Sequence, residues 1–148
     1  MLQTRRLLSA LAFALGLLVV AGCGQTGATV KGTLVLPPKI KVGENDYVQV
    51  TLVPEKEEGE AAPAQVNLSD MSFTAKGPTG KGVHPGNYKV AVSVQLYNTS
   101  NPESEKLKPV VEALNKQYDS ANTKLRYAVT NDPQQSITVD LTKGEVTK

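Results

Sequence analysis

The chain of 148 residues has one cysteine, one histidine and no tryptophan. Cys23 alone cannot form a disulfide within one chain, and Cys23 with His84 cannot supply the ligand set of a zinc site. The sequence also lacks a Gly-x-Ser-x-Gly elbow and a Gly-x-x-x-x-Gly-Lys-Ser/Thr phosphate loop. These absences exclude the commonest enzyme classes. We therefore expect a protein that is not an enzyme and has no catalytic residues, no metal and no cofactor.

Long apolar runs are also absent, except at the N-terminus. Residues 7–20 contain only Leu, Ala, Val, Phe, Gly and one Ser, and they follow Arg5 and Arg6. A positive segment before a short apolar run is typical of a secretory signal peptide, whereas a bilayer-spanning helix needs about 20 apolar residues. We predict that residues 1–22 are a cleaved signal peptide.

The apolar run ends in Val20, Ala21, Gly22 and Cys23. These residues resemble the lipobox of bacterial lipoproteins, which implies that the Cys23 thiol takes lipid, palmitate included, and becomes the new N-terminus. Each buried CH₂ of an acyl chain contributes about 0.8 kcal/mol, so the several chains of a lipoprotein cysteine hold a protein on a membrane. An ordinary secreted protein, or an uncleaved anchor, is the alternative.

The lipobox resemblance also implies a location. It indicates the bacterial cell envelope, with the protein lipid-anchored to a membrane and facing the periplasm or the exterior. Gly24, in place of Asp, resembles lipoproteins that are sorted to the outer membrane, which favours that membrane.

Loss of the leader changes the charge balance. The whole chain has 16 Lys and Arg against 14 Asp and Glu, and loss of Arg5 and Arg6 leaves 14 basic residues against 14 acidic ones. No basic stripe with interleaved aromatic residues is present, so nucleic acid is not an expected partner. No cysteine follows Cys23, so the core alone must stabilise the exported domain.

Residues 28–148 suit one domain, joined to the membrane through the lipidated cysteine and the short linker of residues 23–27. Alternation of apolar and polar residues predicts strands over residues 28–36, 46–54, 87–97 and 135–142. Further short strands are expected on either side of Ser69-Asp70 and near Tyr127. The residues expected to face inward in the long strands are Val30, Leu34, Leu36, Val48, Val50, Leu52, Tyr88, Val90, Val92, Val94, Leu96, Ile137, Val139 and Leu141.

Three segments interrupt the strands. Residues 56–63 are charged and form an expected solvated loop, because the acidic run lacks the spacing of an EF-hand calcium loop. Residues 77–82 form a turn region, followed by Pro85-Gly86 as a type II turn, with His84 as an exposed turn residue. The third segment, residues 98–123, contains an apolar stripe at helical spacing. Pro109 fits only the first turn of a helix, so we predict a helix over residues 108–120. That stripe consists of Leu107, Val110, Val111, Leu114 and Tyr118.

Two segments resemble carboxypeptidase regulatory-like, or transthyretin-like, β-sandwich domains. VKGTL at residues 30–34 and VQVTLVP at residues 48–54 resemble the first two strands of those domains, and GVHPGNYKVAV at residues 82–92 resembles their Pro-Gly-x-Tyr-x-Val motif. The motif implies that Pro85 and Gly86 set a tight turn and that Tyr88 buries its ring while its hydroxyl reaches a backbone partner.

The resemblance implies an all-β fold, an antiparallel Greek-key sandwich of about seven strands with one short helix near residues 108–120. Residues 77–80 and the long insertion at residues 98–123 depart from the family pattern, so the strand register near residues 65–84 stays open.

That family serves adhesion, folding support or binding, and no catalytic residues come with the resemblance. We expect a lipid-anchored structural or protein-binding module of the envelope. Its expected partners are the membrane, through lipid on Cys23, and an envelope protein or a second copy that pairs with its edge strands. The alternative is a periplasmic carrier that binds a small molecule or a glycan between helix and sandwich. A deep apolar pocket beneath Leu114 and Tyr118 would favour that carrier.

Overall fold

The structure, a computed structural model, describes residues 27–56, 59–97 and 102–148. These residues form eight strands and one helix. In chain order the elements are β1 (Thr29–Val35), β2 (Tyr47–Pro54), β3 (Ala62–Asn67), β4 (Ser72–Ala75), β5 (Gly86–Gln95), α1 (Pro102–Tyr118), β6 (Arg126–Val129), β7 (Gln134–Asp140) and β8 (Glu145–Thr147).

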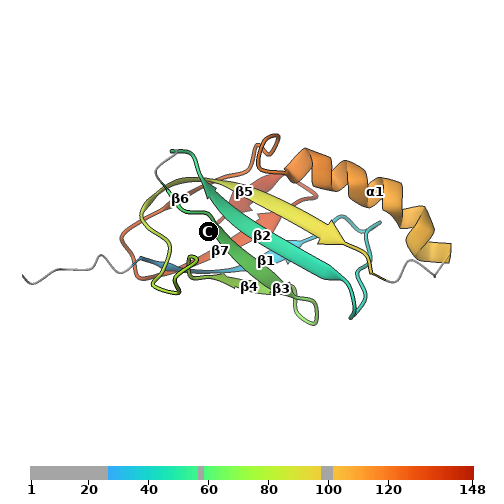
Figure 1. Cartoon of the computed structure of the whole chain (residues 1–148), viewed down its shortest axis with the longest axis horizontal. Helices are drawn as coiled ribbons and strands as arrows, with labels where there is room; N and C mark the ends of the chain where they lie inside the picture. The colour runs from blue at the N-terminus through green and yellow to red at the C-terminus, as the bar shows by residue number, and fades with distance from the viewer. Residues whose placement is uncertain (1–26, 57–58, 98–101) are drawn as a thin grey trace, which may run out of the picture.

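All eight strands belong to one sheet, in the order β6-β5-β2-β3-β4-β1-β7-β8. The two edge strands, β6 and β8, contact each other, so the sheet curls until it is almost closed around a single core (Figure 1). The sheet has two halves, β6-β5-β2-β3 and β4-β1-β7-β8, which are joined where β3 meets β4. Strand β3 pairs along β2, but it meets β4 only at Val66 and Asn67. The predicted mainly-β class is confirmed.

Strands β1 and β7 run parallel, with Thr29 opposite Gln134 and Val35 opposite Asp140. The sequence predicted only antiparallel neighbours, and it did not predict β8. Parallel neighbours need a crossover connection, which here is the whole chain between β1 and β7. Alternation records which side of a strand is buried, but it carries no information on the direction of the neighbouring strand.

The core consists of the inward faces predicted from alternation. Val30, Leu52 and Val90 are fully buried, while Leu36 and Leu96, at strand ends, are only partly buried. The ring of Phe73 fills the space over Gly32, where an added Cβ would lie 2.3 Å from the Phe73 Cζ. A larger residue than glycine would therefore displace this ring.

The predicted loop at residues 56–63 is too long, because Ala62 and Pro63 begin β3. Pro63 pairs with Thr51 of β2, and β4 does not flank β3 at this position. A proline is tolerated in a strand where one side has no neighbour, because the missing N–H breaks no ladder.

The helix begins at Pro102, not at residue 108, and ends at Tyr118. Pro102 and Glu103 suit a first turn, since proline needs no hydrogen-bond partner there and an acidic side chain favours the positive end of the helix dipole. Pro109 lies inside the helix on its exposed side, where water can reach the carbonyl that loses its partner. Val110, predicted in the apolar stripe, is instead 38% exposed.

Candidate functional site

The predicted lipidation residue Cys23 and the lipobox residues Val20, Ala21 and Gly22 lie outside the described residues. The first described residue is Gly27, four positions after Cys23. A chain spans at most about 3.6 Å per residue, so the Cys23 backbone lies within about 14 Å of Gly27. We call Gly27 and the segment of residues 76–87, which is the loop after β4 with the first two residues of β5, the Gly27 end of the fold. It lies on the left of Figure 1.

Backbone hydrogen bonds hold the chain firmly where it enters the fold. The Gly27 N–H donates to the Lys81 carbonyl at 2.9 Å, and Ala28 and Val83 exchange two bonds of 2.8 Å each. The Thr29 N–H then donates to the carbonyl of Pro133 at 2.9 Å. Three consecutive residues are thus fixed, and no hinge separates Gly27 from the sheet.

Glycine is required at this junction. Gly82 has a φ of 101°, and an added Cβ there would lie 2.1 Å from the Gly27 carbonyl oxygen. A Cβ on Gly27 would lie 2.5 Å from the Gly82 carbonyl carbon. The two backbones therefore touch with no space for a side chain, which explains the glycine-rich turn that the sequence predicted at residues 77–82.

Tyr88 lies beside this junction as the Pro-Gly-x-Tyr motif implied. Its ring is buried, and its hydroxyl donates to the His84 carbonyl at 2.8 Å. Burial raises the pKa of the Tyr88 phenol. Gly86 has a φ of 156° and opens β5, whereas a type II turn needs about 80° at that position. The prediction of a type II turn at Pro85-Gly86 is therefore wrong, although the φ of Gly86 is positive.

His84 borders a hollow of about 350 Å³ that is also lined by Glu55, Pro85 and Tyr88. The imidazole is exposed, and no described residue binds it. The Glu55 carboxylate is engaged with Arg126, Nε to Oε1 at 2.7 Å. A general base needs a second group that orients it, and no side chain among the described residues contacts the His84 imidazole.

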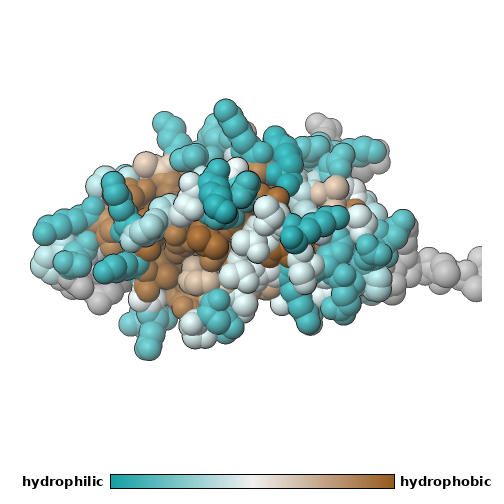
Figure 2. All heavy atoms as spheres, turned by 180° about the vertical axis from the view of Figure 1, so that it is seen from behind, coloured by the Kyte–Doolittle hydropathy of each residue, from teal (hydrophilic) through white to brown (hydrophobic). Residues whose placement is uncertain are grey.

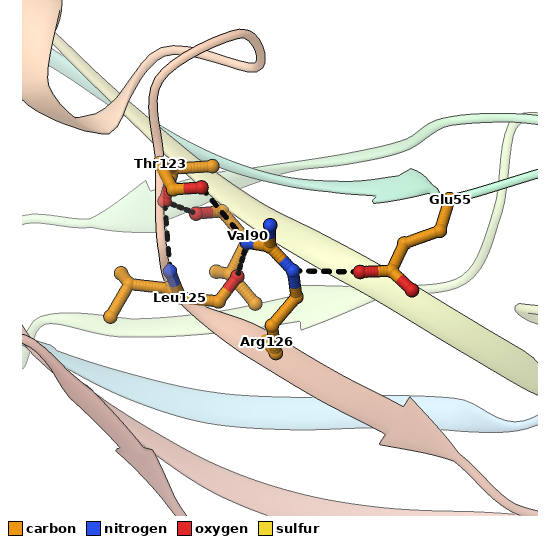
Figure 3. A network of polar contacts seen from close by, with 5 residues as sticks. All are labelled: Glu55, Val90, Thr123, Leu125 and Arg126. Atoms are coloured by element: carbon orange, nitrogen blue, oxygen red, sulfur yellow. Dashed lines mark hydrogen bonds and ion pairs between the residues drawn. The ribbon is translucent and has the colours of Figure 1, made fainter.

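A polar network links the end of β2 to the start of β6 (Figure 3). The guanidinium of Arg126 binds Glu55 and also donates to the carbonyls of Thr123 and Leu125, at 2.8 and 3.0 Å. The buried Thr123 hydroxyl donates to the Val90 carbonyl at 2.8 Å, and the Val90 N–H donates to the Leu125 carbonyl at 3.0 Å. These contacts satisfy the edge of β5 beyond its pairing with β6, so the network is structural.

Helix α1 covers the rest of the β5 edge. Asn115 bonds Val94 twice, with its Nδ2 donating to the carbonyl and its Oδ1 accepting from the N–H, both at 2.8 Å. Leu114 and Tyr118 are buried in the core, and the Tyr118 hydroxyl donates to the Leu141 carbonyl at 3.0 Å. Burial first, and then the charge of Asp140, raises the pKa of Tyr118.

Leu114 and Tyr118 pack into the core, which counts against the deep apolar pocket beneath them that the carrier alternative needs. A hollow of about 320 Å³ borders Tyr118 and is also lined by Lys124 and Leu125. An open hollow of about 500 Å³ lies beside the helix, on the outer face of β2 and β5, with Val53 and Ala91 in its floor. Asn115 and Asp119 line it, but Asn115 is bound to Val94, and Asp119 accepts from the N–H groups of Ala121 and Asn122. Both of these side chains are therefore already used by the fold.

The described surface has few other features that indicate chemistry. Figure 2 shows apolar side chains gathered on the back of the molecule, with hydrophilic ones around them. Among the described residues, no three His, Cys, Asp or Glu side chains form a group that could hold a metal ion. Of those residues, none belongs to a helix long and apolar enough to cross a bilayer.

No protein-family model, no curated protein and no solved structure matches the chain. Three residues that complete the β5 edge were not predicted from the sequence: Asn115, Thr123 and Arg126. Asn115 precedes Lys116, and Thr123 lies between Asn122 and Lys124, so in the sequence both resemble ordinary solvent-facing positions.

Proposed function

We propose that the protein is a lipid-anchored, non-catalytic module of the bacterial cell envelope that binds another envelope protein or has a structural role. One observation carries the proposal: the lipobox residues 20–23 follow a charged and apolar leader and come four positions before a chain entry that is fully hydrogen-bonded. A lipid on Cys23 would hold such a domain directly at the membrane.

The polar contacts near the Gly27 end support a non-catalytic role. Glu55 is paired with Arg126, and the Tyr88 hydroxyl is used by the His84 carbonyl. Both contacts stabilise the fold, and they occupy the Glu55 carboxylate and the Tyr88 phenol that line the hollow beside His84. The burial of Leu114 and Tyr118 in the core favours this role over the carrier.

We also propose that the domain is a transthyretin-like, Greek-key sandwich of the carboxypeptidase regulatory-like family. The support is local: the Tyr88 ring is buried and its hydroxyl bonds backbone four residues earlier, the arrangement that the Pro-Gly-x-Tyr motif implies. A partner strand would add to an edge of the sheet, where backbone groups lack neighbours.

Metabolic labelling with palmitate tests the anchor. Wild-type protein expressed in a bacterium should carry the label and sediment with membranes, whereas Cys23→Ala should carry none. Gly24→Ala is the matched control, since it changes the neighbouring residue but keeps the thiol, and it should be labelled. Label retained by Cys23→Ala would overturn the proposal. Crosslinking in intact cells, followed by identification of the attached protein, then addresses the partner.

A further inference from the structure

We propose that the segment of residues 76–87 lies on the bilayer surface, with Lys76 and Lys81 against the phosphates of the phospholipid headgroups. This inference rests on the proposed lipid anchor at Cys23. It adds an orientation and a second membrane contact, made by side chains of the folded domain.

The tether defines which end of the fold meets the membrane. The Gly27 N–H donates to the Lys81 carbonyl at 2.9 Å, so the Lys81 backbone lies within about 17 Å of the lipid attachment point. The opposite end, residues 36–46, begins after the seven residues of β1, which span about 20 Å. Because no hinge follows Gly27, the Gly27 end rests at the surface and the opposite end points away.

The charge of the loop suits a phosphate surface. Residues 76–87 contain Lys76 and Lys81, both exposed, and no Asp or Glu. Lysine side chains extend their ammonium groups on flexible apolar stems, and a basic residue near an anionic bilayer is attracted to it. The nearby carboxylate of Glu55 is offset by Arg126. The lysines therefore face the headgroups with little competition from within the loop.

Label quenching tests the orientation. Cys23 is the only cysteine, and lipid blocks its thiol, so Thr79→Cys and Asn45→Cys each offer one reactive site for a fluorophore. Both positions are exposed turn residues, at the Gly27 end and at the opposite end. The lipidated mature protein is placed in vesicles of phosphatidylethanolamine and phosphatidylglycerol that contain a lipid with a nitroxide on its headgroup. We expect quenching to be several-fold stronger at position 79 than at position 45.

Equal quenching at the two positions, or stronger quenching at position 45, would overturn the inference. The double variant Lys76→Gln/Lys81→Gln should reduce quenching at position 79, while Lys39→Gln/Lys41→Gln, at the opposite end, should leave it unchanged. No change in the first double variant would overturn the lysine contact. Failure of the anchor is a separate result: an unlipidated protein would not float with the vesicles, and quenching is measured only on protein that does.

Discussion

The side chain of Asn115 takes the place of a neighbouring strand for Val94. Its amide donates to the Val94 carbonyl and accepts from the Val94 N–H, both at 2.8 Å, as a strand residue would. Strand β6 pairs only with residues 86–89 of β5, so this contact completes an edge that would otherwise be open. Open strand edges invite pairing with other chains. Helix α1 thus directs any strand-adding partner to another edge of the sheet.

Replacement of Asn115 should destabilise the fold. In Asn115→Leu both Val94 backbone groups lose their partner, and at about 1 kcal/mol for each hydrogen bond we expect a loss of about 2 kcal/mol in the free energy of unfolding. Urea denaturation measures it. Gln117→Leu, on the exposed side of the same helix, is the control and should change stability by less than about 0.5 kcal/mol. Equal stability of the two variants would contradict the role of Asn115.

Removal of the Tyr88 hydroxyl should cost about 1 kcal/mol, because the His84 carbonyl then loses its donor while the ring stays in the core. Tyr88→Phe and Tyr97→Phe form a matched pair, since Tyr97 is 64% exposed and its hydroxyl bonds only Gln95, at the surface. Thermal unfolding should show a lower Tm for Tyr88→Phe alone. A similar Tm for both variants would show that the hydroxyl contributes nothing to the corner.

Two glycines with positive φ allow the stability cost of backbone strain to be measured apart from the cost of steric overlap. Gly80 has a φ of 71° and open space where its Cβ would be, so Gly80→Ala should cost only the left-handed strain of about 1 kcal/mol. Gly82→Ala adds an overlap with the Gly27 carbonyl and should cost about 3 kcal/mol or more. Hydrogen exchange at the Gly27 N–H provides a second measurement. Equal losses of stability would contradict the close contact of the two backbones.

Acid should weaken the fold through Asp119 and Asp140. The Asn122 N–H holds the pKa of Asp119 below its usual value, and the Thr142 hydroxyl does so for Asp140. The folded pKa is lower than the unfolded one, so both contributions are present above about pH 4 and are lost as the pH falls through the folded pKa. Urea denaturation between neutral and acid pH should show this decline. In Asp119→Asn the free energy of unfolding should fall less steeply as the pH falls. An equally steep fall would contradict the contribution of Asp119.

The sequence predicted those parts of the fold whose residues alternate. Val48, Val50 and Leu52 are buried because one face of β2 packs on the core, and alternation records that directly. Alternation does not indicate that β1 and β7 run parallel, because the direction of a neighbouring strand depends on how the chain crosses the sheet. The helix start was wrong because Pro109 was assigned to a first turn, whereas an exposed helix face tolerates it. The role of Asn115 depends on which strand lies beneath it, which only the folded structure shows.

Intact-mass spectrometry of the protein purified from bacterial membranes shows directly whether Cys23 is the lipidated N-terminus. We expect one polypeptide that begins at Cys23, with added mass equal to a diacylglyceryl group, with or without a further acyl chain, all located on the N-terminal peptide. A polypeptide that begins at another residue, or one that begins at Cys23 with a free thiol, would contradict it.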